Sequence, residues 1–286
     1  WTHEQSVARG MVDLRRLPTR ASSCLSCHLG DGKREVDHEL IASGHPILAF
    51  ELDNYSETMP AHWAPHKDTH GIPAWATGQA VAFRDSMSNL ARHARGDKWP
   101  EFSDMSCFNC HHALTNESTS RQERGWPGRA GLPAWSPQHW AVLRLVIGRV
   151  SPSTRNQLDG LVADVSSRVS RMSDREGTAA AADEARRVID SVIPKIASAS
   201  WSSEDIRAMM RAVAADDSVM SYDVHSAEQT ALSLQSLSAT LTRNNPSLLK
   251  SRMTAAIDAL FEEVRDRNRY DANRFAQKLR DVRDTL

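Results

Sequence analysis

The segment WATGQAVAFRDSMSNLARHARG, residues 75–96, carries a clear helical pattern in the first half of the chain. Its apolar residues recur at intervals of three and four: Ala80, Phe83, Met87 and Leu90. This spacing places them on one face of a helix, and Gly96 is a suitable stop. Residues 38–52, HELIASGHPILAFEL, form a second helix-like piece. We expect this piece to break at Gly44-His45-Pro46, because the residue before a proline avoids the α region.

A short cysteine motif lies on each side of residues 75–96: CLSCH at 24–28 and CFNCHH at 107–112. These two motifs use all four cysteines of the chain, and a histidine follows each pair directly. The CxxCH pattern is typical of covalent attachment of a c-type haem. Two thiols three positions apart reach the two vinyl groups of the macrocycle, and the next histidine supplies an axial nitrogen to the iron. The sequence therefore predicts two haem c groups, one held by Cys24, Cys27 and His28, the other by Cys107, Cys110 and His111.

Zinc binding, disulfides and a thioredoxin-like redox pair are alternative interpretations of CxxC. A zinc ribbon separates its cysteine pairs by about 15–20 residues, whereas here residues 28 to 106 lie between them. A thioredoxin-like pair requires a βαβ context, which the sequence does not indicate. The histidine repeated after both pairs favours haem over all three alternatives.

The second axial ligand of each iron is expected to be a histidine, since ten of the twelve histidines precede residue 115. Methionine is the alternative, with Met11, Met59, Met87 and Met105 available. His38 and His45 are seven residues apart, so on one helix they share a face roughly 10 Å apart and serve two irons rather than one. His112 diverges from His111 by about 100° on a helix, so we expect it to face the first haem.

The other histidines are weaker candidates. His62, His66 and His70 have the spacing of a helical metal site, but Pro60, Pro65 and Pro73 oppose a continuous helix there. His3 could reach back to a haem. We expect His93 to be a surface residue of an amphipathic helix, and His139 and His225 to be ordinary bundle or loop residues.

The second half of the chain predicts α-helices. Residues 125–137, GWPGRAGLPAWSP, are too rich in glycine and proline for regular structure and predict a linker. Apolar stripes at helical spacing follow, within 158–172 (with Gly177 able to end that run), 206–213, 227–241, 249–264 and 275–282. We expect a mostly α fold with three parts: a loop-rich dihaem c-type cytochrome domain at 1–124, the linker at 125–137 and an α-helical bundle at 138–286.

Composition limits the partners. The formal net charge is −1 and the pI is near 6.9, which gives no reason to expect nucleic acid. The apolar run WAVLRLVIG, 140–148, is too short for a membrane span and contains Arg144. The chain starts at WTHEQSVARG without a signal pattern, so we expect a signal to have been removed or the sequence to be a mature or partial product.

The first 115 residues or so resemble the multihaem c-type cytochromes related to the cytochrome c554 family. The resemblance is carried by RASSCLSCHLGDGKREVDHELIASGHPILAFEL, MPAHW, WATGQAV and WPEFSDMSCFNCHHAL, with a weaker likeness at YDVHSAEQTALSLQSL. It implies closely packed, mostly bis-histidine haems, with His38, His45 and His112 as leading distal ligands and His45 as the first choice. Many relatives carry further haem motifs upstream, which this chain lacks.

These features predict an electron-transfer dihaem cytochrome c with low-potential haems and no catalytic residue. The alternatives are a haem-bearing relay or structural subunit of a larger redox complex, or a multihaem oxidoreductase with one open iron. Redox partner proteins, other cytochrome subunits or a second copy of the chain are the expected partners. Because bacteria attach haem through thioethers outside the cytoplasmic membrane, the resemblance implies a periplasmic or otherwise extracytoplasmic protein.

Overall fold

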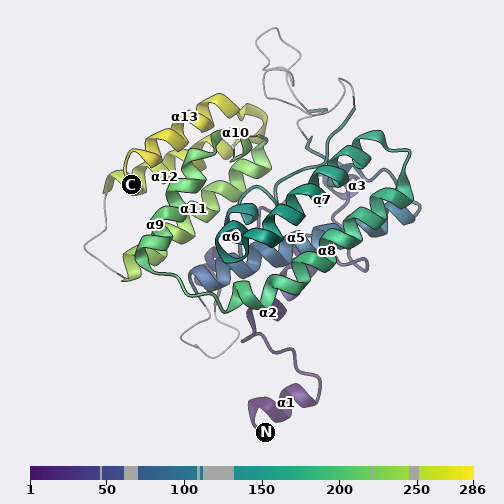
Figure 1. Ribbon diagram of the computed structural model, residues 1–286, viewed down its shortest axis with the longest axis horizontal. Helices are drawn as coiled ribbons and strands as arrows, with labels where there is room; N and C mark the ends of the chain where they lie inside the picture. The colour runs from purple at the N-terminus through teal and green to yellow at the C-terminus, as the bar shows by residue number, and fades with distance from the viewer. Residues whose placement is uncertain (46, 61–69, 108–109, 112–131, 221, 245–250) are drawn as a thin grey trace.

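A computed structural model describes residues 1–45, 47–60, 70–107, 110–111, 132–220, 222–244 and 251–286, and these residues are mostly α-helical (Figure 1). The first half contains α1 (His3–Ala8), α2 (Leu17–His28), α3 (His38–Ala42), α4 (Leu52–Thr58), α5 (Ile72–Arg95) and the 3₁₀ turn η1 (Phe102–Asp104). The second half contains α6 (Leu143–Val150), α7 (Pro152–Arg171), α8 (Arg175–Ala197), α9 (Ser203–Ala215), α10 (Asp217–Met220), α11 (Val224–Asn244), α12 (Ser251–Val264), the turn η4 (Arg267–Arg269) and α13 (Ala272–Arg283). The expected mostly α fold is confirmed.

Helix α5 lies at the centre, where it packs against α2, α4, α6, α8 and α11 (Figure 1). Gly71 precedes it with a φ of +74°, a conformation that favours glycine, and Gly96 caps its end as the sequence predicts. Most of its residues are buried, on more than one face, because neighbours surround it. The apolar stripe predicted from the sequence therefore accounts for only part of the surface that α5 buries.

Small residues let the neighbouring helices approach α5 closely. A Cβ added at Gly78 would lie 2.7 Å from the Cβ of Leu52 on α4, closer than real Cβ contacts allow. On α8, the buried face likewise carries small side chains, those of alanines 179, 181, 182 and 185. Close packing of α4 on α5 matters for the site, because α4 carries Tyr55, which contacts His28.

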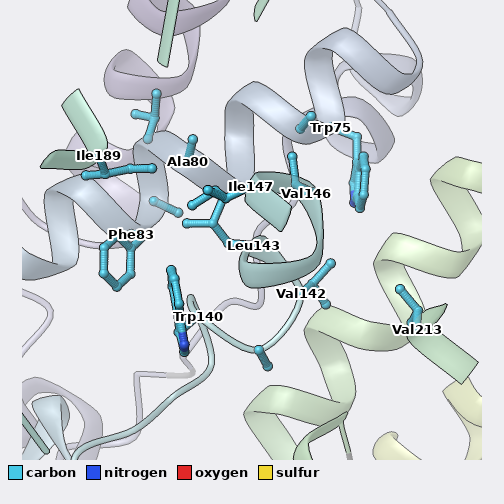
Figure 2. Packing of buried hydrophobic residues seen from close by; sticks show 14 of the residues in the cluster. Trp75, Ala80, Phe83, Trp140, Val142, Leu143, Val146, Ile147, Ile189 and Val213 are labelled. Atoms are coloured by element: carbon cyan, nitrogen blue, oxygen red, sulfur yellow. The ribbon is translucent and has the colours of Figure 1, made fainter. Parts of the chain in front are cut away.

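The core beside α5 is aromatic and aliphatic (Figure 2). The rings of Phe83 and Trp140 have centroids 5.2 Å apart and are tilted by 42°. Leu143, Val146 and Ile147 of α6 fill the space next to them, and all three are fully buried. The residues just before α6 are thereby fixed against the central helix.

Helices α9 to α13 form a second group that contacts the first through α11 and through α6 with α9 (Figure 1). Ser202 and Asp205 form the capping box that opens α9. Asp223 accepts the backbone N–H of Ser226 at 2.8 Å and so caps the start of α11. The apolar stripes that the sequence predicts on α9, α11, α12 and α13 are buried and so confirmed.

The expectation for Gly177 is wrong, and helix α8 was not foreseen. Helix α7 ends at Arg171, followed by Met172 with a φ of +56°. The side chain of Asp174 then accepts the backbone N–H of Gly177 at 3.0 Å, so Gly177 lies in the first turn of α8. The capping aspartate starts a new helix where glycine alone suggests a stop.

One cluster of buried side chains runs from Leu17 to Val282, across the expected boundary at 125–137. Residues 125–131 of the expected linker lie outside the described part, and the three-part division stays a prediction. Among the described residues, no helix combines the length and apolar character needed to cross a bilayer.

Candidate functional site

The first cysteine motif forms the end of α2. Leu17, Ala21 and Leu25 bury one side of this helix, which packs against α5. Cys24 is partly buried and Cys27 is exposed, and both thiols are free. Burial raises the pKa of Cys24. The helix thus presents two unlinked thiols one turn apart, as the haem interpretation requires.

His28, the last residue of α2, points its ring into an aromatic corner. Its ring centroid lies 4.7 Å from that of Phe50 and 5.6 Å from that of Tyr55. The Nδ1 atom is buried and has no hydrogen-bond partner among the described residues. Burial lowers the pKa of His28, so the neutral imidazole, the form that binds metals, is favoured.

The second cysteine motif follows a segment that is hydrogen-bonded to residues near the end of the expected linker. The backbone N–H of Ser106 donates to Ala134 at 2.9 Å, and that of Ser136 donates to Asp104 at 3.0 Å. The backbone N–H groups of Cys110 and His111 both donate to Cys107, at 3.1 and 2.8 Å. This turn brings Cys107 and Cys110 together, while Phe108, Asn109 and His112 lie outside the described residues.

A cleft of about 600 Å³ opens beside this second motif. Cys107, Cys110 and His111 line it, together with three histidines from elsewhere in the chain, His38, His45 and His225. The rest of its wall is mainly apolar and includes Ile41, Ile47, Phe102, Met105, Val224 and Tyr270. Its volume lies within the range of about 300–1,000 Å³ that is usual for cofactor pockets. A porphyrin-sized apolar group fits these residues.

The structure thus gathers two of the expected distal ligands, His38 and His45, around the second motif. They do not share a helix, because α3 ends at Ala42 and Gly44 has a φ of +98°. Both residues are exposed. The ring of His38 meets that of Phe102 edge-on, with centroids 5.7 Å apart.

His225 was expected to be a bundle or loop residue; it lies on helix α11 and also contacts the second motif. It is buried at the start of α11, and its Nε2 atom lies 3.5 Å from the Sγ of Cys107. Its Nδ1 lies 3.1 Å from Oε2 of Glu228. The other carboxylate oxygen of Glu228, Oε1, accepts a 2.7 Å hydrogen bond from Arg267. Burial lowers the pKa of His225, but the hydrogen bonds with Cys107 and Glu228 outweigh it and raise that pKa to about 10.

His139, which was also expected to be a bundle or loop residue, lies in the turn before α6. It lines a smaller cavity of about 60 Å³ beside His28, and both of its ring nitrogens are buried without a hydrogen-bond partner among the described residues. Burial, together with the nearby His225, lowers the pKa of His139 to about 4. This cavity and the larger cleft share Ile41, Ile47 and Ser103 as wall residues. The two motifs therefore face adjoining spaces.

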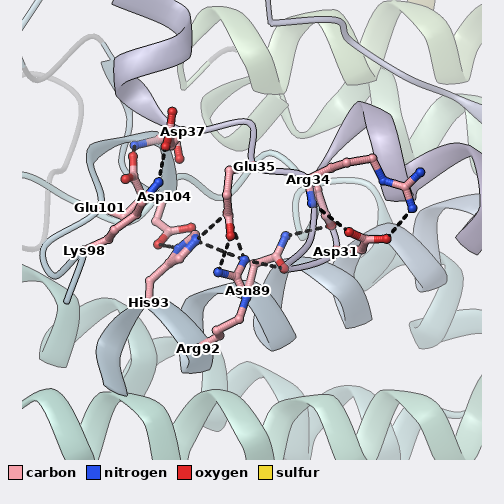
Figure 3. Close-up of polar contacts among 12 residues, drawn as sticks. Asp31, Arg34, Glu35, Asp37, Asn89, Arg92, His93, Lys98, Glu101 and Asp104 are labelled. Carbon is pink, nitrogen blue, oxygen red and sulfur yellow. Dashed lines mark hydrogen bonds and ion pairs between the residues drawn. The ribbon is translucent and has the colours of Figure 1, made fainter. Parts of the chain in front are cut away.

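A polar network on the last turns of α5 holds both motifs in place (Figure 3). The Asn89 amide donates to the carbonyls of Leu29 and Gly30, directly after the first motif. Arg92 forms an ion pair with Glu35 at 2.6 Å. His93 Nδ1 lies 2.7 Å from Asp104, three residues before the second motif. One helix therefore fixes the chain after the first motif against the chain before the second.

His93 is not the surface residue that the sequence predicted. Its side chain is 6% exposed and also approaches Glu35, at 3.4 Å. Burial lowers the pKa of His93, but the hydrogen bond and charge of Asp104 outweigh it, and the net shift is upward. Its position three residues after the buried Leu90, on the same side of the helix, was the signal for burial.

The remaining histidines are elsewhere. His3 pairs with Asp13 at 3.0 Å near α1, which lies at one edge of the molecule (Figure 1). His70 lies with Asp53 and Glu57 in a group whose ligand atoms are close enough for a metal ion. Arg243 forms ion pairs with both carboxylates there, and its positive charge offsets one of their two negative charges. His62 and His66 lie outside the described residues.

The methionines considered as ligands are spread through the fold. Met105 lines the larger cleft, Met87 is fully buried on α5, and Met11 and Met59 are exposed. Comparison of the chain with protein-family models, with curated proteins and with solved structures finds no match.

Proposed function

We propose that the chain is a dihaem c-type electron-transfer protein. Cys24 and Cys27 would attach one haem, with His28 as an axial ligand. Cys107, Cys110 and His111 would hold the other. The observation that carries the proposal is the cleft of about 600 Å³, where free thiols, His111 and further histidines face one mainly apolar space.

A bound c-type haem supplies reversible one-electron oxidation and reduction at its iron. The residues around the cleft are suited to support that chemistry. The apolar side chains keep water away, which tunes the potential of a buried redox group. The surplus histidines offer a second axial nitrogen, and an iron with two protein ligands has no position for a substrate. Electron transfer is therefore favoured over catalysis.

The adjoining cavities support transfer within the molecule. Because Ile41, Ile47 and Ser103 belong to both walls, two groups held at the two motifs would lie close together. The smaller cavity, of about 60 Å³, lies well below the range of about 300–1,000 Å³ that is usual for cofactor pockets, so it does not by itself hold a porphyrin. We propose redox proteins as partners and an extracytoplasmic location, where covalent haem attachment takes place.

Expression with the haem-attachment machinery tests the proposal. Intact mass and pyridine haemochrome analysis should show two covalent haems per chain. The variant C24A/C27A should lose one, and C107A/C110A should lose the other. Ser23→Ala is the matched control, since Ser23 is exposed on α2 and its hydroxyl bonds only to the backbone carbonyl of Thr19; it should keep both.

A colourless product from cells that mature another c-type cytochrome correctly would reject the proposal. Four titratable thiols together with bound zinc would replace it with a metal site, for which Cys107, Cys110, His111 and His225 are the available ligands.

A further inference from the structure

The larger cleft has one permanently charged side chain in its wall. Among the described residues that line it, Arg267 is the one arginine or lysine, and there is no aspartate or glutamate. The planar guanidinium of arginine binds carboxylates well, because it can donate two parallel hydrogen bonds to them. The cleft is therefore suited to a ligand that is mainly apolar and carries carboxylates at one edge.

Two hydrogen bonds hold the Arg267 side chain in a fixed orientation. The residue belongs to the turn η4, between α12 and α13. Its Nε donates to Oε1 of Glu228, and its Nη2 donates to the carbonyl of Ile47, both at 2.7 Å. A guanidinium has five N–H donors, so further donors remain for a ligand. A fixed group with spare donors suits a binding role, since its geometry is reproducible.

Glu228 orients Arg267 without making the cleft anionic. Both residues line the neighbouring groove, but Glu228 is not among the residues that line the cleft. The second oxygen of its carboxylate, Oε2, lies 3.1 Å from Nδ1 of His225. Glu228 thus holds Arg267 from outside the cleft and leaves the place of a ligand carboxylate open.

A chain of contacts joins Arg267 to the second cysteine motif. His225 Nε2 lies 3.5 Å from the Sγ of Cys107, and the other nitrogen of this ring contacts Glu228. Glu228 in turn accepts the bond from Arg267. A haem attached through its vinyl groups at Cys107 and Cys110 carries two propionate carboxylates at another edge of the macrocycle. Arg267 lines the same cleft as these two cysteines and has the charge to bind that edge.

We propose that Arg267 binds the propionate carboxylates of the haem attached at Cys107 and Cys110, and so orients that haem with its carboxylate edge toward η4. This inference rests on the proposed function. It gives the helices at the end of the chain a part in the haem site, because η4 connects α12 to α13. A positive charge beside the propionates also favours the reduced haem, so Arg267 should raise the reduction potential.

Redox titration and resonance Raman spectroscopy test the assignment. In the C24A/C27A background, only the second haem remains. Arg267→Gln should lower the midpoint potential of this haem, because the propionate charge is no longer offset. The propionate bending band in the Raman spectrum should shift too, since it responds to hydrogen bonds at the carboxylate.

Arg269→Gln is the matched control. It removes the same charge two residues further along, from a side chain that is 87% exposed and is not among the residues that line the cleft. We expect the midpoint potential and the Raman band of this variant to stay close to those of the parent protein.

Two further variants keep the test decisive. Arg267→Gln also leaves Glu228 without a cationic partner, so the double variant Arg267→Gln/Glu228→Gln removes both charges. Its propionate band should remain shifted. If Arg267→Gln does not mature, Arg267→Lys keeps the charge but not the planar fork. It should mature with a potential nearer that of the parent protein and a shifted propionate band.

An unchanged propionate band in Arg267→Gln, or in Arg267→Lys where that variant has to replace it, would overturn the assignment. An equal shift of the band in Arg269→Gln, or its return to the parent position in the double variant, would also overturn it. A wild-type protein without covalent haem would reject the proposed function itself, which is a separate outcome.

Discussion

The Nε2 atom of His225 lies 3.5 Å from the Sγ of Cys107, although 118 positions separate the two residues. The contact joins the first turn of α11 to the second cysteine motif. Glu228 holds the other ring nitrogen and is itself held by Arg267, so the imidazole has a fixed orientation. A histidine anchored by a carboxylate in this manner is common beside metal sites.

Glu228→Gln should destabilise the protein by about 2 kcal/mol, because it removes a charged acceptor shared by two cationic partners. The loss should appear as a lower urea midpoint with an unchanged slope. The control is Glu262→Gln, since Glu262 on α12 makes an exposed ion pair with Arg265, just after the helix. We expect it to change stability by less than about 0.5 kcal/mol. If Glu228→Gln lowered the free energy of unfolding no more than Glu262→Gln does, the His225–Glu228–Arg267 contacts would add no stability beyond that of an exposed ion pair.

His93 should make stability fall as the pH rises above neutrality. The pKa of His93 is higher in the folded protein than its usual value of 6.5, so the folded state holds the proton more tightly. Its contribution is complete below about pH 6.5 and is lost as the pH passes the folded-state pKa. Urea unfolding between about pH 6 and 9 should show this decline in the wild type and a flatter profile in His93→Gln. If the stability of His93→Gln fell with rising pH as steeply as that of the wild type, the decline could not be assigned to the proton held by the His93–Asp104 pair.

Much of the helical framework is predictable from local sequence. The pattern in 75–96 locates α5 because apolar spacing and a terminal glycine agree. Ser202 with Asp205 marks the start of α9, because a capping box is a purely local signal. The start of α8 was missed, since the alanines at 179–182 carry little apolar contrast and Asp174 has to be recognised as a cap.

The histidines show where sequence reasoning fails. The cysteine motifs can be recognised from their spacing. His139 and His225 come near these motifs only through long-range packing, which the local sequence does not show. Glu228, three residues after His225, was a local sign that this histidine is held in place. For His139 no comparable local sign exists, because its distinguishing feature is that its ring nitrogens have no hydrogen-bond partner within the described part of the chain.

The close approach of α4 to α5 should be sensitive to one methyl group. In Gly78→Ala the new Cβ would lie 2.7 Å from that of Leu52, so α4 must shift. We expect a loss of about 1–3 kcal/mol, and a change in the environment of Tyr55 visible in near-ultraviolet circular dichroism. Gly160→Ala is the matched control, because Gly160 is exposed on α7 and a Cβ there meets nothing within 4 Å. It should stabilise the protein by about 0.5–1 kcal/mol, and a stabilising Gly78→Ala would contradict the packing argument.

The larger cleft leads to a last prediction, on the ligand of the second iron. His38 and His45 both line this space, but the ring of His38 is already stacked edge-on against Phe102. The ring of His45 has no such contact among the described residues. We therefore expect His45→Ala to convert the second haem to the high-spin state, and His38→Ala to leave it low-spin. Both variants should be compared in the C24A/C27A background, so that only the second haem contributes to the ferric spectrum. High-spin conversion in His38→Ala alone would transfer the ligand role to His38, and conversion in neither would leave His225 and Met105 as the described candidates in the cleft wall.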